Sequence, residues 1–162
     1  GLMSLASGCP GLTELSVVSC GIGDVGLRAL SGGCSGLATL RLCNTLRTTD
    51  AGVAEAISCL PKLQLLALRY MDRIGRTTLA AVAKTCQDLV SLDLEYCPAV
   101  DDESALAVVE NCPKLRALTL THCRLITEAA VATMRRKNPL LGSNLETVLP
   151  AAQPADGPKA VM

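Results

Sequence analysis

The residues best suited to chemistry in this 162-residue chain are two tyrosines and one histidine at equal spacing. Tyr70, Tyr96 and His122 follow one another at intervals of 26 residues, and the chain holds no other Tyr or His and no Phe or Trp. Tyrosine is enriched among the residues that dominate protein–protein binding. Neighbouring rings can also stack, which contributes about 0.5–1.5 kcal/mol per pair beyond burial. Two interpretations therefore stay open: a strip that recognises a partner, or a packing ladder along one rim.

Polar and charged residues share this spacing. Asn44 and Ser19 stand one and two repeats before Tyr70. Two further sets alternate with apolar positions, namely Ser16, Arg41, Ala67, Asp93, Thr119 and Val18, Cys43, Arg69, Glu95, Thr121. Arg69 and Glu95 would lie side by side, either as a surface ion pair worth under about 1 kcal/mol or as a charged anchor for a partner. The candidate partner-binding residues are Tyr70, Tyr96, His122, Asn44, Arg41, Arg69, Asp93 and Glu95.

Catalysis has little support from the residue types. His122 has no Ser or Cys partner that its local sequence identifies, because Cys123 should point inward while His122 points away. Asp101 and Asp102 stand at an expected helix start, where capping explains them, and no phosphate-binding spacing such as G-x-x-x-x-G-K occurs. The 15 basic and 15 acidic residues cancel, and no apolar run is long enough to span a bilayer. The sequence thus favours neither an enzyme nor binding to nucleic acid or a membrane.

A repeat of about 26 residues positions all of these side chains. Its three apolar positions recur as Leu12, Leu37, Leu63, Leu89, Leu115, then Leu15, Leu40, Leu66, Leu92, Leu118, then Val17, Leu42, Leu68, Leu94, Leu120. Each unit predicts a strand followed by a helix. Asp24, Asp50 and Thr127 are expected to open three of the helices, and Thr77 or Thr78 to cap the looser third one. Such a unit cannot bury its own apolar face, so neighbouring units must stack.

Most of the nine cysteines are fixed to this repeat. Cys9, Cys34, Cys86 and Cys112 stand three residues before the first leucine position, and Cys20, Cys97 and Cys123 three residues after the third apolar position. Residues placed in this way are expected to be buried in the repeat core as small apolar groups. The odd number also argues against a disulfide framework. We expect reduced thiols and an intracellular protein, cytoplasmic or nuclear. Zinc is disfavoured because no C-x-x-C pair occurs and His122 is the only histidine, so no metal or cofactor is expected.

The pattern C-x-x-L-x-x-L-x-L-x-x-C-x-x-[IV]-[TD] resembles the cysteine-containing leucine-rich repeat, most clearly at residues 112–127 and 86–102. The resemblance implies an α/β, right-handed leucine-rich-repeat solenoid (a horseshoe) with a parallel sheet on the concave face and helices on the convex face. This repeat type is typical of F-box/leucine-rich-repeat proteins. In that family an F-box docks on the adaptor of a Skp–cullin–F-box ubiquitin ligase, and the repeats hold the substrate. No F-box stands in these residues, so only the recognition half is implied.

The solenoid is expected over residues 1–141, as a partial first repeat plus about five repeats. Residues 142–149 are expected to form a C-terminal cap, in which Asn144 stands where a leucine would be and residues 145–149 can form a short strand. Residues 150–162 are expected to be disordered, since they hold three of the eight prolines. The chain starts inside a unit, which suggests the C-terminal part of a longer protein.

The sequence as a whole predicts a protein–protein recognition module. The resemblance points to the substrate-binding repeats of a Skp–cullin–F-box ubiquitin ligase receptor, with the adaptor contacted through a missing N-terminal region. The alternative is a structural scaffold in a larger assembly with no role in ubiquitin transfer, and a weaker third is a regulator that binds another enzyme. In each case a protein partner would lie on the concave face or its rim.

Overall fold

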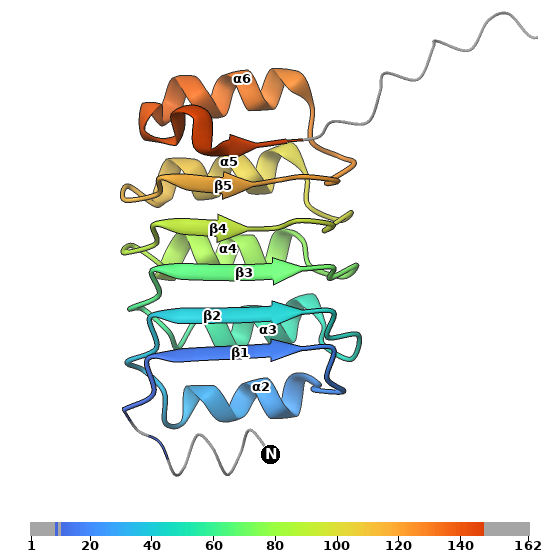
Figure 1. The fold of residues 1–162 in the computed structure, drawn as a ribbon, viewed down its shortest axis with the longest axis vertical. Helices are drawn as coiled ribbons and strands as arrows, with labels where there is room; N and C mark the ends of the chain where they lie inside the picture. Colours follow the sequence, from blue (N-terminus) through green and yellow to red (C-terminus); the bar gives the residue numbers. More distant parts are fainter. Residues whose placement is uncertain (1–8, 10, 148–162) are drawn as a thin grey trace, which may run out of the picture.

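The computed structural model describes residue 9 and residues 11–147 as a right-handed solenoid with one parallel sheet (Figure 1). The strands run in the order β1 to β6, so each repeat pairs with the repeat before and after it. Every helix lies on the same side of the sheet (Figure 1). The expectations for residues 1–8, for the last two residues of the expected cap (148–149) and for residues 150–162 fall outside the described residues.

The strands are β1 (Glu14–Val18), β2 (Thr39–Cys43), β3 (Leu65–Arg69), β4 (Ser91–Asp93), β5 (Ala117–Thr119) and β6 (Leu145–Glu146). The helices are α2 (Asp24–Ser31), α3 (Asp50–Ile57), α4 (Arg76–Thr85), α5 (Asp102–Asn111), α6 (Glu128–Lys137) and the 3₁₀ helix η1 (Pro139–Asn144). The helices expected to open at Asp24 and Asp50 begin there, and Thr127 is the N-cap of α6.

The repeat leucines form one buried cluster between sheet and helices, as predicted. All three apolar positions of every repeat are buried except at Leu12, which is partly buried and packs against the cluster. The strand register pairs Leu40 with Leu66 and Leu66 with Leu92, so equal positions of successive repeats lie side by side. The sheet therefore repeats each outward side chain at the spacing of neighbouring strands, about 4.8 Å.

The last strand departs from the 26-residue spacing. Leu145, not Asn144, pairs with Leu118 of β5 and is buried, so this step is 27 residues long. The extra residue is taken up in η1, where Gly142 adopts a left-handed φ of 43°. Glycine has no Cβ to clash in that conformation. The expected missing leucine is thus present one position later, because a short helix and not the repeat turn precedes it.

Two of the buried cysteines donate hydrogen bonds to backbone oxygens of the neighbouring repeat. The Cys97 thiol donates to the carbonyl oxygen of Leu68 at 2.8 Å, and the Cys123 thiol donates to that of Leu94 at 3.1 Å. Burial is the main reason that the pKa of Cys97 is raised to about 12 and that of Cys123 to about 11. At neutral pH both thiols stay protonated and are poor nucleophiles.

Two cysteines do not follow the expectation of burial. Cys9 and Cys20 are exposed, whereas Cys34, Cys86 and Cys112 are buried like Cys97 and Cys123. The thiol of Cys20 donates to the carbonyl oxygen of Val18 in its own repeat, at 3.2 Å. The physical reason is position: β1 is the first strand of the described sheet, so no described strand precedes it to cover this thiol or offer its carbonyl.

Acidic side chains at the helix starts tie each repeat to the next. Asp24 accepts hydrogen bonds from the backbone N–H and the hydroxyl of Thr49, at 2.8 and 2.7 Å. Asp102 accepts the same two bonds from Thr127, one repeat further than its own helix, also at 2.8 and 2.7 Å. The carboxylate of one repeat therefore holds the N-cap residue of the following helix in place.

Helix α4 is capped from the repeat before it, which corrects the expected role of Thr77 or Thr78. Its N-cap is Gly75, which has no side chain to accept a hydrogen bond. Asp50 accepts instead from the backbone N–H groups of Gly75, Thr77 and Thr78, at 2.9–3.0 Å. Burial alone would raise the pKa of Asp50, but these hydrogen bonds together hold it below its ordinary value of 3.8.

The polarity of this connection reverses at the next repeat. Arg76 stands where Asp24, Asp50 and Asp102 stand in their repeats, and its guanidinium donates to Asp101 at 2.8 Å. Asp101 is the N-cap of α5, where it accepts from the backbone N–H of Ser104 at 3.0 Å in a capping box. The link between repeats is therefore kept with the charges exchanged.

Candidate functional site

Each of five consecutive strands is followed, one or three residues after its end, by a residue with the same unusual backbone conformation. Left-handed φ values are found at Ser19 (49°), Asn44 (53°), Tyr70 (55°), Tyr96 (56°) and His122 (63°), here termed the exit column. Residues other than glycine are uncommon in this region, because Cβ crowds the backbone. In the first four, the backbone N–H donates a hydrogen bond to a carbonyl oxygen of the next repeat. Tyr70, for example, donates to the carbonyl oxygen of Glu95 at 2.9 Å. The parallel register therefore brings the five side chains to one edge of the sheet.

The side chains of the exit column contact one another in two groups. The rings of Tyr70 and Tyr96 stack with centroids 4.7 Å apart and an interplanar angle of 15°. Tyr96 and His122 stack at 4.1 Å and 29°. The amide of Asn44 donates to the hydroxyl of Ser19 at 3.3 Å. The structure thus contains the packing ladder that was one of the two interpretations, yet Tyr70 and Tyr96 keep 44% and 39% of their surface exposed.

Three charged candidates form one cluster on the outer face of the sheet. The Arg69 guanidinium donates through Nε to Asp93 at 2.6 Å and lies 3.6 Å from the Glu95 carboxylate. The hydrogen bond to Asp93 is the main reason that the pKa of Arg69 is raised. The ion pair expected between Arg69 and Glu95 is present, but Asp93 is the closer partner. The pair of Arg69 with Asp93 was not predicted from the sequence, because the two residues belong to different outward columns and Arg69 reaches diagonally from one to the other.

Arg41 lies apart from this cluster and lines a hollow of about 360 Å³ beside it. Its side chain is exposed and has no hydrogen bond or ion pair with any residue that the structure describes. Asp93 and Arg69 line the same hollow, together with Leu65 and Ser91. Leu65 and Ser91 belong to a third outward column, formed by the first residue of each of the strands β1 to β5: Glu14, Thr39, Leu65, Ser91 and Ala117.

A second hollow of about 410 Å³, here termed the exit groove, runs beside the exit column. It is lined by four residues of the exit column, Asn44, Tyr70, Tyr96 and His122, and by the residue two positions after each of them, Leu46, Asp72, Pro98 and Arg124. The last four residues were not predicted from the sequence as part of a site, although they also recur every 26 residues. Their types differ so much, from leucine to arginine, that only the spacing could have revealed them.

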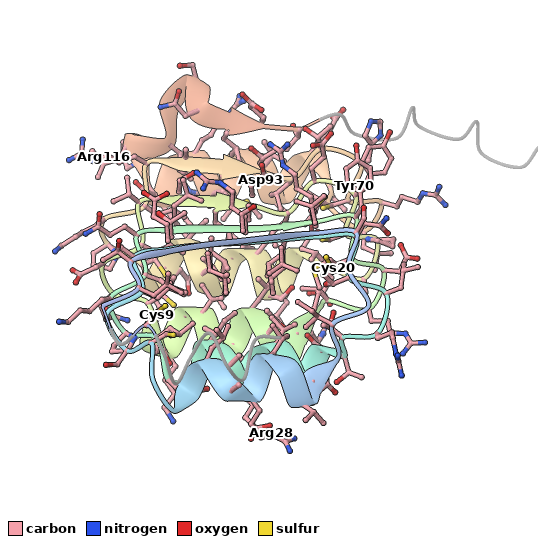
Figure 2. The ribbon with its side chains drawn as sticks, turned by 60° about the horizontal axis from the view of Figure 1, so that its bottom comes forward. Cys9, Cys20, Arg28, Tyr70, Asp93 and Arg116 are labelled. Carbon is pink, nitrogen blue, oxygen red and sulfur yellow. The ribbon has the colours of Figure 1, made fainter. Side chains whose placement is uncertain are left out.

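The candidate residues share one side of the molecule. Figure 2 shows Asp93 above the sheet and Tyr70 at the edge where the strands end, while Arg28 projects from α2 on the opposite side. Within the described residues, no three His, Cys, Asp or Glu side chains are grouped so that they could hold a metal ion. The helices in that part of the chain are all too short or too polar to cross a bilayer. The site offers exposed rings and charges on a fixed backbone.

Comparison with known proteins agrees with this architecture. The sequence profile described as a leucine-rich repeat matches residues 8–31 and 85–109. A chain in the crystal structure of the Rad7 and Elc1 complex in yeast has a similar fold, with a TM-score of 0.58 and 18% sequence identity. The match covers 81% of this chain and 40% of that one. Together with the stacked strand–helix units, these findings show the fold of a leucine-rich-repeat solenoid.

Proposed function

We propose that the chain is a protein-recognition module whose partner contacts the outer face of the sheet and the exit column. The observation that carries this proposal is the alignment of exposed rings and charges on one side of a rigid stack. Their positions are fixed by strand pairing, so little ordering is needed when a partner binds. The exposed tyrosines are of a type that dominates binding energies. Buried thiols such as those of Cys97 and Cys123 stay protonated and are poor nucleophiles. In this proposal the chain acts by binding and not by catalysis, inside the cell in cytoplasm or nucleus.

The biological setting that we favour is substrate selection by a Skp–cullin–F-box ubiquitin ligase. Its support is the cysteine-containing repeat pattern, together with the likeness in fold to a chain solved in the Rad7 and Elc1 complex. The alternative is a scaffold that holds a larger assembly together without ubiquitin transfer. Purification of the full-length protein from its own cells separates the two. A ligase receptor brings down a Skp-type adaptor and a cullin at constant ratio, whereas a scaffold brings down neither.

The recognition surface itself is tested with matched charge reversals. Arg69→Glu breaks the cluster with Asp93 on the proposed surface, and Lys84→Glu reverses an exposed charge on α4, on the opposite side. We expect Arg69→Glu to weaken capture of the co-purified partner about tenfold and Lys84→Glu to leave it unchanged. Equal effects, or a loss with Lys84→Glu alone, would remove the outer face of the sheet as the binding surface.

The exit column is tested separately by Tyr70→Ala combined with Tyr96→Ala. Removal of both rings takes away the largest exposed apolar surface of the column. Partner binding should weaken about tenfold or more, because buried aromatic anchors commonly contribute over about 1–2 kcal/mol each. Unchanged binding by the folded double variant would reduce the column to a packing ladder.

A further inference from the structure

The exit groove carries two opposite charges that nothing in the described structure neutralises. Asp72 and Arg124 stand at equivalent positions two repeats apart, and both side chains are exposed. Neither charged group has a hydrogen bond or ion pair with another described residue. Pro98 occupies the same position in the repeat between them. Along successive repeats the groove therefore presents the apolar Leu46, the negative Asp72, the uncharged Pro98 and the positive Arg124.

Asp72 differs in this respect from the other aspartates that the structure describes. Asp24, Asp50 and Asp102 bind the next repeat, and Asp93 and Asp101 bind arginines. Asp72 is an exposed carboxylate left available beside the Tyr70 ring, which is itself 44% exposed. An arginine or lysine of a partner could pair with Asp72 and place its stem or guanidinium against that ring.

The spacing of the two charges fits an extended chain. Neighbouring parallel strands lie about 4.8 Å apart, so positions two repeats apart are separated by roughly 10 Å. A peptide extended in the polyproline II conformation advances about 3.1 Å per residue with three residues per turn, so side chains three positions apart share one face and roughly cover this distance. In the repeat between the charges the groove is lined by Tyr96 and Pro98, which suit uncharged side chains.

We propose that the exit groove binds an extended segment of a protein partner in which a basic and an acidic residue stand three positions apart. The basic residue pairs with Asp72 beside Tyr70, and the acidic residue pairs with Arg124 beside His122. The inference rests on the proposed recognition function and specifies the chemistry of the partner. On this side of the molecule the carboxylates of Asp72, Asp93 and Glu95 balance the guanidinium groups of Arg41, Arg69 and Arg124. No net positive charge therefore favours a nucleic acid strand.

The experiment is selection of random displayed peptides against the purified 162-residue chain and two single-charge variants. Wild type should enrich one basic and one acidic residue three positions apart. Asp72→Lys should enrich two acidic residues at the same spacing, and Arg124→Glu two basic residues. A synthetic wild-type consensus peptide should bind Arg124→Glu about tenfold more weakly, with Lys84→Glu as the unaffected control. Circular dichroism confirms that each variant is folded.

Several outcomes would overturn the proposal. One is a consensus that stays the same in Asp72→Lys and Arg124→Glu, and another is selection that yields no charge pair. If selected peptides lose binding with Arg69→Glu and keep it with Arg124→Glu, the recognition function stands and the exit groove is the wrong site. A fluorescent oligo-thymidine that binds more tightly than the consensus peptide would show that the groove is a nucleic acid site instead.

Discussion

At the residue scale, the exit column combines a backbone that glycine would prefer with side chains that glycine lacks. A left-handed backbone costs a residue with a Cβ roughly 1–2 kcal/mol. Asparagine and histidine tolerate this conformation comparatively well, but tyrosine does not. Two stacked pairs, each worth about 0.5–1.5 kcal/mol, can offset the cost. The rings of Tyr70, Tyr96 and His122 therefore stabilise the edge as a unit and not one at a time.

Two substitutions of Tyr96 separate strain from stacking. Tyr96→Gly and Tyr96→Ala both remove the stacks with Tyr70 and His122. Alanine keeps a Cβ at a φ of 56°, whereas glycine does not. We expect Tyr96→Ala to be less stable than Tyr96→Gly by about 1 kcal/mol, although alanine is usually the more stable residue. The measurement is urea denaturation followed by circular dichroism, and an alanine variant at least as stable as the glycine variant contradicts this account.

The buried thiols predict how stability changes at alkaline pH. Burial raises the pKa of Cys86 and Cys97 to about 12 and that of Cys112 to about 11, from an ordinary value of 9.0. Above pH 9.0 the unfolded chain releases these protons while the folded chain retains them. Ionisation therefore stabilises the unfolded state, and the free energy of unfolding falls. The contribution is complete below pH 9.0 and is lost as the pH rises toward 12. Urea midpoints should fall over this interval, and less steeply in Cys86→Ala.

At the element scale, the helices depend on carboxylates that belong to other repeats. α4 shows this most clearly, because its cap residue Gly75 offers no side chain and Asp50 supplies the acceptor. α6 is a natural comparison, since Thr127 caps it directly through the backbone N–H of Ala130 while Asp102 only supports Thr127. The Asp50 carboxylate is therefore expected to contribute more to stability at α4 than the Asp102 carboxylate contributes at α6.

Asp50→Ala should cost about 1–2 kcal/mol, and Asp102→Ala less, because only the first leaves a helix without any cap. Asp50→Asn keeps an acceptor oxygen and should fall between wild type and Asp50→Ala. The pKa of Asp50 is held below 3.8, so its carboxylate contributes above pH 3.8 and the contribution disappears as the pH falls through the lower folded value. Guanidinium unfolding at neutral and acidic pH measures both effects. A larger cost for Asp102→Ala would contradict the assigned roles.

Gly52 in α3 shows how the connection between repeats restricts helix composition. Alanine in a helix is usually more stable than glycine by roughly 0.5–1 kcal/mol. A Cβ at Gly52 would overlap the Asp24 carboxylate that holds Thr49, whereas a Cβ at Gly36 meets nothing within 4 Å. We expect Gly52→Ala to destabilise by about 1–3 kcal/mol and Gly36→Ala to be close to neutral. Thermal unfolding of the pair decides, and a stabilised Gly52→Ala would show that Asp24 moves freely.

These elements also show what could be predicted from the sequence. The strands, the helix starts at Asp24 and Asp50 and the buried leucines follow from a pattern that recurs every repeat, so local spacing was sufficient. The capping of α4 by Asp50 could not be predicted, because it joins residues 25 to 28 positions apart. The proposed role of Asp72 depends on its carboxylate having no partner among the described residues, which only the packed structure reveals.

At the scale of the whole molecule, stacking converts a sequence repeat into a surface. One buried cluster runs from Leu15 in β1 to Leu145 in β6, so the sheet moves as a unit and presents its outer face as a fixed array. Each exposed column then offers one side chain per strand spacing of about 4.8 Å. The array carries charges at its centre, rings at the strand ends and the exit groove beside them. A partner that binds this array of side chains would contact several repeats at once.

The most direct test of the recognition function is amide hydrogen exchange on the full-length protein, alone and bound to its co-purified partner. Binding at the proposed surface should slow exchange at residues 41–46, 67–72, 93–98 and 119–124, where strands end and turns begin. Exchange in α3, α4 and α5 should stay nearly the same, because these helices lie on the other side of the sheet (Figure 1). Protection confined to the helices, with unchanged strand ends, would contradict the account.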